Sequence, residues 1–244
     1  TATGDLTARN IGAVTAVVDG IVLSSLTSQQ VGEPAGNILV DTVGPVTTAN
    51  TAAGGTGLLL SAQHGAITVR DVAGIDARLD GVNASASGGI AVTATRAAIT
   101  SRTASGLLLN AGTGVSVQSN QAITGATDGV STTTTSGNID ISLNKLVTGQ
   151  TGSGIYANAS AGNVTIADNA GIVGGQNAII ALGAGAIVID RNAAISSSSD
   201  IATYASGATV AYTNNGATAG GKDGVALSGA TSVTASGNGA FTAA

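Results

Sequence analysis

The sequence predicts an all-β protein, a right-handed three-strand parallel β-helix of about ten rungs of about 24 residues, with an asparagine ladder. Two observations predict this fold. An Asn recurs at one fixed distance after an apolar strand residue, and pairs of alternating apolar residues return about once every 24 residues. A self-similar period of this length is typical of a solenoid, in which each rung, one turn of the helix, buries its apolar side chains against neighbouring rungs.

The stretch from Gly162 to Ile172, GNVTIADNAGI, shows the repeating unit. Val164 and Ile166 alternate with small or polar residues, which is the period-two pattern of a strand with one buried face. An Asn follows Val164 by five residues. The same offset of five recurs in six consecutive repeats and predicts a structural ladder made of Asn120, Asn144, Asn169, Asn192, Asn215 and Asn238.

Asparagine suits this position for two physical reasons. It tolerates a left-handed backbone better than other non-glycine residues, so we expect the ladder residues to form the bend between two strands. Stacked amides can also hydrogen-bond from one rung to the next, as in the side-chain ladders of cross-β structures. The alternative is that Asn is an ordinary turn residue in a Gly-rich chain. The fixed offset favours the ladder.

Each rung is expected to contain a first strand, a Gly turn, a second strand, the Asn corner and a short third strand. The expected rung starts are Gly12, Gly36, Gly57, Gly81, Gly106, Gly129, Gly154, Ala178, Asp200 and Gly224. Apolar pairs such as Leu107 and Leu109 mark the first strand, and pairs such as Ile139 and Ile141 mark the second. The third strand is anchored by Ile75, Ile99, Ile123, Val147, Ile172, Ile195 and, in the last rung, Phe241. An α-helical fold is excluded, because the apolar spacing is wrong and Gly is frequent throughout.

Composition excludes several classes of protein. Charged residues make up 9% of the 244 residues and aromatic residues 2%, with 37 Gly, no Cys and a formal net charge of −5. A disulfide scaffold is excluded, and nucleic acid is not an expected partner. No apolar run is long enough for a transmembrane helix, and residues 1–10 do not form a signal peptide. We therefore expect a cytosolic chain or a mature piece of an exported protein, and the rung pattern favours the exported protein.

Few residues could carry chemistry. His64 is the sole His, so a zinc site or a catalytic triad has too few residues, and we expect a solvated loop residue. Carboxylates gather with Arg in two places, as enzymes that cleave polysaccharides on a β-helix require. The first group is Asp71, Asp76, Asp80, Arg70 and Arg78, and the second is Asp168, Asp190 and Arg191. Solubilising charge on the outer face is the favoured interpretation of both groups.

Other motifs give no positive signal. Residues 220–224, GGKDG, lack the pattern of a calcium-binding repeat, and no phosphate-binding loop occurs. The N-x-[ST] triplets at Asn83, Asn158 and Asn163 are expected by chance in a Ser/Thr-rich chain. The run STTTTS at 131–136 has no counterpart in neighbouring repeats, so an ice-binding array is not expected. We predict no catalytic residue, no cofactor and no metal ligand.

Rungs such as GIYANASAGNVTIADNAGIVG and AIIALGAGAIVIDRNAAISS resemble the passenger region of bacterial autotransporters and related filamentous-haemagglutinin-type adhesins. The resemblance covers nearly the whole chain, from about Gly12 to Ala244. It implies a right-handed β-helix, secretion by the type V route and display on the surface of a Gram-negative bacterium. The absence of Cys fits this route, because disulfides would hinder the export of an unfolded chain. The resemblance transfers no catalytic residue.

We therefore expect a structural or adhesive protein of the bacterial cell surface or extracellular space, a rigid stalk or filament that is not an enzyme. One alternative is a polysaccharide-binding or lyase-like β-helix enzyme, and another is a filament subunit that assembles end to end. Expected partners are another copy at the ends, or a glycan or protein on a host or bacterial surface.

Residues 1–244 are expected to form one β-helical domain, a segment of a longer surface protein or a filament subunit. Leu6 to Asn10 are expected to end an earlier rung, and neither end has a helix or charged cap. Uncapped rungs expose backbone groups that can pair with another chain. The expected apolar columns are Val14, Val17, Ile21 and Leu23 at one end, and Val225, Leu227, Val233 and Phe241 at the other.

Overall fold

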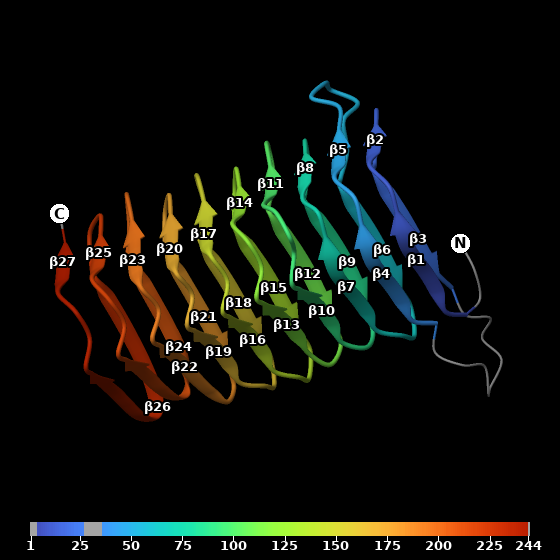
Figure 1. Cartoon of the computed structure of the whole chain (residues 1–244). Coiled ribbons are helices and arrows are strands. Elements are labelled where there is room, and N and C mark those ends of the chain that lie inside the picture. Colours follow the sequence, from blue (N-terminus) through green and yellow to red (C-terminus); the bar gives the residue numbers. More distant parts are fainter. Residues whose placement is uncertain (1–3, 27–35, 244) are drawn as a thin grey trace.

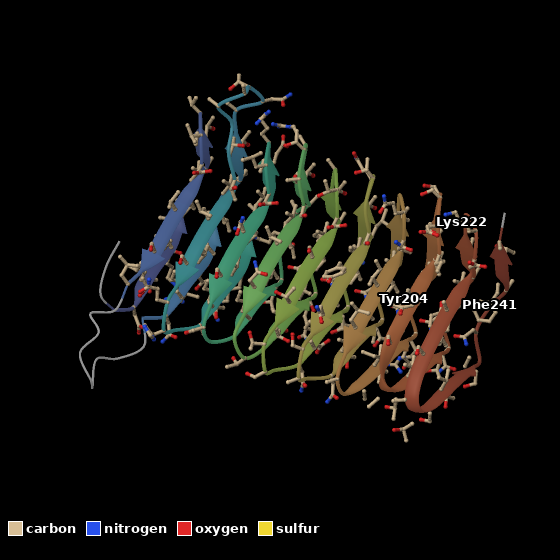
Figure 2. The ribbon with its side chains drawn as sticks, turned by 180° about the vertical axis from the view of Figure 1, so that it is seen from behind. Tyr204, Lys222 and Phe241 are labelled. Carbon is tan, nitrogen blue, oxygen red and sulfur yellow. The ribbon has the colours of Figure 1, made fainter. Side chains whose placement is uncertain are left out.

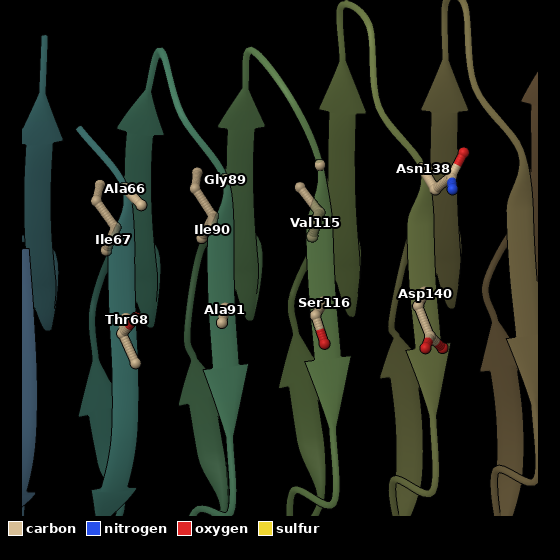
Figure 3. A pocket seen from close by; sticks show the side chains of 11 residues that line it. Ala66, Ile67, Thr68, Gly89, Ile90, Ala91, Val115, Ser116, Asn138 and Asp140 are labelled. Carbon is tan, nitrogen blue, oxygen red and sulfur yellow. The ribbon is translucent and has the colours of Figure 1, made fainter. Parts of the chain in front are cut away.

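The computed structural model describes residues 4–26 and 36–243 and shows a parallel β-helix (Figure 1). Equivalent strands of successive rungs stack side by side from the N-terminal to the C-terminal end, and every pairing between these strands is parallel. In Figure 3, the near strands run downward and the strands behind them run upward, while the rungs advance from left to right. The coil is therefore right-handed. The predicted fold class is confirmed.

Three kinds of strand alternate along the described chain. The first strands are β3 (Ile21–Ser25), β6 (Leu58–Ala62), β9 (Val82–Ala86), β12 (Leu107–Ala111), β15 (Val130–Thr134), β18 (Ile155–Ala159) and β21 (Ile179–Gly183). The second strands are β1 (Leu6–Ile11), β4 (Ile38–Val43), β7 (Ile67–Val72), β10 (Ile90–Thr93), β13 (Val115–Gln118), β16 (Ile139–Ser142), β19 (Val164–Ala167) and β22 (Ala186–Asp190). The third strands are β2 (Val14–Ala16), β5 (Val46–Thr48), β8 (Ile75–Ala77), β11 (Ile99–Ser101), β14 (Ile123–Gly125), β17 (Leu146–Gly149), β20 (Gly171–Gly174), β23 (Ala194–Ser197), β25 (Thr218–Gly220) and β27 (Phe241–Ala243).

Near the C-terminal end, the first and second strands of a rung fuse. β24 (Thr203–Thr213) and β26 (Val225–Ser236) each run through the corner that separates two strands elsewhere. A register shift between Gly207 and Thr209 marks where that corner lies in β24. Through these fused strands, the first and second strands form one 17-stranded sheet among the described residues, and the third strands form a 10-stranded sheet.

The core consists of columns of apolar side chains that run along the axis. Residues of like position pair in register, so Ile139 lies between Val115 and Val164, and Ile123 lies between Ile99 and Val147. Nearly all inward Val, Ile and Leu residues of the middle rungs are fully buried. This burial is possible only because successive rungs cover each other, since a single rung would expose both sides of its apolar centre.

The corners bring backbone segments of neighbouring rungs into close contact. Gly137, before β16, lies so near the preceding rung that a Cβ atom added to it would overlap the carbonyl oxygen of Thr113. A side chain at such a corner would therefore force the rungs apart. Close approach explains why Gly is frequent in a chain whose strands are otherwise rich in Val and Ile.

The predicted rung starts are correct in the middle of the chain and wrong near the N-terminal end. Ile21 donates a hydrogen bond to the carbonyl of Gly57 at 2.9 Å, which makes Gly20 the equivalent of Gly57. Gly36 instead packs on Gly65 at the following corner. The assignment failed because Gly occupies more than one corner of each rung, so Gly spacing alone does not identify the corner.

Because the first rung starts were misassigned, the apolar column expected at the N-terminal end was also wrong. Val14 belongs to a third strand, whereas Ile21 and Leu23 belong to the first strand of the following rung. Val17 is 67% exposed and belongs to no column. The expected tail of an earlier rung is confirmed, because β1 is a second strand that pairs with β4.

A smaller error affects the predicted rung start at Asp200. The backbone N–H of Thr203 donates to Gly224 at 3.1 Å, so Ala202 rather than Asp200 matches Gly224. At the far end, Phe241 pairs with Thr218 and is the third-strand anchor of the last described rung, as predicted.

Candidate functional site

The asparagine ladder is confirmed in all six predicted positions. Each side-chain nitrogen Nδ2 donates to the Oδ1 atom of the next ladder residue along the axis. The Nδ2–Oδ1 distances are 3.0 Å for Asn120–Asn144, 3.0 Å for Asn144–Asn169, 2.8 Å for Asn169–Asn192, 3.0 Å for Asn192–Asn215 and 3.3 Å for Asn215–Asn238.

Each internal ladder residue joins three rungs. The Oδ1 atom of Asn169 accepts from the backbone N–H of Asn144 at 3.2 Å and from its Nδ2 at 3.0 Å. The Nδ2 atom of Asn169 donates forward to Asn192 and back to the carbonyl of Ile141 at 3.0 Å. Because the residue is only 1% exposed, these partners replace water completely. The ladder is therefore a buried and fully satisfied polar column.

The ladder residues do not themselves adopt the left-handed backbone, which corrects the expectation from sequence. The residue immediately before each one does: φ is between 50° and 59° at Ser119, Leu143, Asp168, Arg191 and Asn214, and 66° at Gly237. This residue turns the chain at the corner, and the Asn that follows can then enter the core. The bend and the ladder therefore use two adjacent positions.

Leu143 is an unfavourable residue for that bend, because its φ is 59° and left-handed backbone costs a non-glycine residue about 1–2 kcal/mol. We expect Leu143→Asn to raise the free energy of unfolding by about 0.5–1 kcal/mol, since Asn tolerates this conformation. Thermal unfolding measures the gain. Leu146→Asn is the control, because Leu146 is also exposed but has no positive φ; an equal gain from this variant would contradict the explanation.

The first rungs have a different arrangement at the same corner. The position equivalent to the ladder Asn holds Ile11, Val43, Val72 and Thr95 instead. The backbone hydrogen bonds that these residues make to the next rung identify them as equivalent. Here the neighbouring outward positions carry ion pairs between rungs. Those pairs are Arg9–Asp41 at 2.7 Å, Arg70–Asp41 at 3.1 Å and Arg96–Asp71 at 2.7 Å.

Asp41 is the centre of this ionic column. Its side chain is only 5% exposed and lies between Arg9 and Arg70, one from each adjacent rung. Hydrogen bonds from Arg70 and then Arg9 lower the pKa of the Asp41 carboxyl from 3.8 to about 2, although burial opposes the shift. The carboxylate therefore stays charged in mild acid.

This pKa gives a prediction for acid stability. A lowered pKa in the folded state stabilises the fold above the unfolded value of 3.8, and the contribution is lost as the pH falls toward about 2. We expect the melting temperature of the wild type to fall over this window more than that of Asp41→Asn. The two Arg side chains are about half exposed, so high salt should weaken the difference. Parallel pH profiles for the two proteins would contradict the assignment.

The structure does not bring the first predicted acidic group together as one site. Asp76 pairs with Arg102 rather than with Arg78, and Arg70 pairs with Asp41. Asp80 lies at another corner and accepts hydrogen bonds from the Asn83 side chain and the Ser105 backbone. Burial raises the pKa of Asp80, against the effect of these two hydrogen bonds. These residues therefore contact separate partners on neighbouring rungs and do not converge on one point.

The second predicted group does come together. Arg191 binds Asp168 through two nitrogen–oxygen contacts of 2.8 Å and also contacts Asp190. Burial by itself would raise the pKa of Asp190, but hydrogen bonds from Thr213 and Asn214 and the charge of Arg191 lower it overall. A general acid in glycoside hydrolysis needs the opposite shift, a raised pKa. This group has the properties of a rung-to-rung clamp.

Two further polar columns were not predicted. At the corner before the first strand, the Oδ1 atoms of Asp19, Asp80 and Asp128 accept the backbone N–H of the next rung at 2.6–3.1 Å. Asn37, Asn138 and Asn163 accept backbone N–H groups at the corner before the second strand. The signal for the first column was available, since Asp-Gly or Ser-Gly pairs precede many first strands.

His64 is an exposed bend residue between β6 and β7. Within residues 4–26 and 36–243, no group of three His, Cys, Asp or Glu side chains could hold a metal ion. The same part of the chain contains no helix that could cross a lipid bilayer.

The outer face of the first strands carries a stripe of larger apolar side chains, which we call the apolar stripe. It follows the register from rung to rung, and Tyr156, Ile180 and Tyr204 are successive neighbours in it. Tyr204 is 38% exposed (Figure 2), and Val22 at the other end of the stripe is 54% exposed. The full stripe contains Val22, Leu59, Leu108, Tyr156, Ile180 and Tyr204, interrupted by Asn83 and Ser131.

A shallow hollow of about 450 Å³ lies over the second strands β7, β10, β13 and β16 (Figure 3). Small residues such as Gly89 and Ala91 line it, and its one charged group is Asp140. Asp140 accepts a hydrogen bond from the Gln118 side chain. The hollow therefore offers contact area but no acid–base pair.

No protein-family model, curated protein or solved structure matches this chain.

Proposed function

We propose that the chain is a rigid rod that serves as a structural or adhesive element on the surface of a Gram-negative bacterium, after export by the type V route. The observation that supports this proposal most strongly is what the polar and charged side chains contact. Ladder amides, corner carboxylates and most Arg side chains bind the neighbouring rung. These groups stabilise the stack instead of converging on one point where a substrate could react.

The resemblance of the rungs to autotransporter passengers and filamentous-haemagglutinin-type adhesins supports export and display. The parallel β-helix is the architecture that this resemblance implies. A stack of about ten rungs at about 4.8 Å per rung gives a rod of about 48 Å, which can hold a binding surface away from a membrane. The absence of Cys fits an exported chain without disulfides.

The apolar stripe is the surface on which we place adhesion. Tyrosine supplies both an apolar ring and a polar tip, and it is common where proteins bind partners. The chain contains three Tyr, and two of them, Tyr156 and Tyr204, lie in this stripe. A glycan or a protein on a host or bacterial surface is the proposed partner.

An adhesion assay tests this proposal. Beads coated with the purified chain are incubated with bacterial and epithelial cells, next to beads coated with Tyr156→Ser/Tyr204→Ser. We expect the wild-type beads to adhere and the double variant to lose most of this adhesion, with an unchanged melting temperature. Thr165→Ala, on the outer face of a second strand, is the control. Equal adhesion by all proteins, or by none, would contradict the adhesive role.

The second candidate function is that of a polysaccharide-cleaving enzyme, favoured only by the group of Asp168, Asp190 and Arg191. Uronate and neutral polysaccharides are the substrates to test. We expect no product from the wild-type chain. Turnover that disappears in Asp168→Asn or Asp190→Asn would establish the enzyme and displace the structural proposal.

A further inference from the structure

Two ladder residues, Asn215 and Asn238, are followed by Gly, whereas every other Asn of the sequence precedes a residue with a side chain. An Asn–Gly pair is the peptide step most prone to deamidation, because the attacking Gly nitrogen has no neighbouring Cβ that would hinder it. Asn215 is only 2% exposed and has ladder partners on both sides. The chain therefore holds a chemically reactive amide inside the column that stabilises it.

Deamidation of Asn215 needs only water as a co-reactant. The backbone nitrogen of Gly216 loses its hydrogen and bonds to the Cγ atom of Asn215. The Cγ–Nδ2 bond then breaks, and ammonia leaves with that proton. Water opens the resulting succinimide ring and gives aspartate or isoaspartate at position 215.

The rod holds both reacting groups in other contacts. The Gly216 N–H donates to the carbonyl of Asn192 at 2.8 Å. The Nδ2 atom of Asn215 donates to the carbonyl of Ile189 at 2.9 Å and to the Oδ1 atom of Asn238 at 3.3 Å. Its Oδ1 atom accepts from the backbone N–H and the Nδ2 of Asn192 at 3.1 and 3.0 Å. The reaction therefore requires this rung to separate from its neighbours.

The product would prevent the rung from closing again. Loss of Nδ2 removes the donor to Ile189 and Asn238 and places a carboxylate against these two acceptors. A buried charge without a partner is strongly unfavourable. Isoaspartate also inserts its Cβ atom into the main chain between β24 and β25, which disturbs the register of β25 on β23.

We propose that Asn215 is a modification site that is silent in the closed stack and is deamidated only when its rung opens. Modification then makes a transient opening permanent, so the same amide both stabilises the rod and marks where it has opened. The inference is independent of any role of the rod at a cell surface, because it depends only on the ladder and on the residue that follows Asn215.

Mass spectrometry of the full chain measures this modification at each site. Trypsin cuts after Arg191 and Lys222, so one peptide contains both Asn215 and Asn192. Asn192 is the internal control, because it occupies the same corner but precedes Ala. In denaturant at mildly alkaline pH, we expect Asn215 to deamidate at least about tenfold faster than Asn192. In the folded rod, we expect deamidation of Asn215 to be about a hundredfold slower or more, because only local opening exposes it.

Variants that loosen the neighbouring rung test the dependence on opening. Ile189 is fully buried, and Ile189→Ala removes more of its side chain than Ile189→Val. We expect deamidation of Asn215 to rise by about tenfold or more in the Ala variant and by less in the Val variant, because a larger cavity makes opening more frequent. Val188→Ala, at an outward position of the same strand, is expected to leave the rate unchanged. Equal rates in the wild-type rod and in denaturant, or no acceleration in either Ile189 variant, would overturn the proposal.

Asn215→Asp tests the consequence of the modification. We expect the Gly216 amide to exchange hydrogen about tenfold faster or more in this variant, because the rung no longer closes fully. Asn158→Asp, at an outward position of β18, is the control and is expected to leave this exchange unchanged. Wild-type protection of Gly216 in Asn215→Asp would show that a modified rung closes again, and would overturn the proposed permanence.

Discussion

Ile189→Asp is expected to unfold the rod over several rungs at once. Ile189 is fully buried between Ile166 in the preceding rung and Tyr212 in the following one. A carboxylate at this point has no cationic partner, and a buried unpaired charge costs roughly 3–5 kcal/mol or more. Because each rung is stable only with its neighbours, the loss extends beyond the substituted rung.

The matched control is Val188→Asp on the same strand. Val188 alternates with Ile189 and belongs to the outward positions, where it pairs with Thr165 and Ala211. We expect this variant to change the free energy of unfolding by less than about 1 kcal/mol, as for other surface substitutions. Thermal unfolding followed by circular dichroism measures both variants. If the two variants lose equal stability, the axial column is not what holds the rod together.

Most of the fold could be predicted from sequence because each rung of a solenoid repeats the same pattern of apolar strand residues and corner residues. The period-two pattern of Val164 and Ile166 recurs in every rung, so an error in one rung is corrected by the next. The Asn offset was equally informative, since a buried amide column requires one residue type at one place in each rung. Phe241 could even be assigned to the third strand of the last rung by its distance from Asn238.

The failures have specific physical causes. Gly12 and Gly36 were assigned to the wrong corner because close backbone contact requires Gly at several corners of a rung. The left-handed position was missed because Leu143 and Arg191 give no compositional sign of that backbone. Tertiary stacking imposes the conformation on whichever residue precedes the ladder Asn.

The ionic groups were hardest to predict. Sequence proximity suggested that Arg70 and Arg78 would meet Asp71, Asp76 and Asp80. In a β-helix, however, outward residues meet those one whole rung away. Thus Asp41 meets Arg9 and Arg70 at sequence separations of 32 and 29 residues. Only an exact register identifies such partners, and the register of the first rungs was the part that Gly spacing misassigned.

Asn169→Ala is expected to cost more than the loss of one ordinary hydrogen bond. The substitution leaves the two donors of Asn144 without an acceptor and the carbonyl of Ile141 without its side-chain donor. Each buried polar group left unsatisfied costs about 1–3 kcal/mol, so we expect a total loss of at least about 3 kcal/mol.

Asn238→Ala is the internal comparison for Asn169→Ala, because it removes the same amide from the end of the ladder. Asn238 is partly exposed, so water can reach the groups of Asn215 that it leaves behind. We therefore expect a loss of only about 1 kcal/mol. Denaturant unfolding of both variants measures the difference. Equal losses would mean that the ladder acts as a set of independent corner contacts, whereas the expected excess at Asn169 identifies a buried column whose strength depends on continuity across rungs.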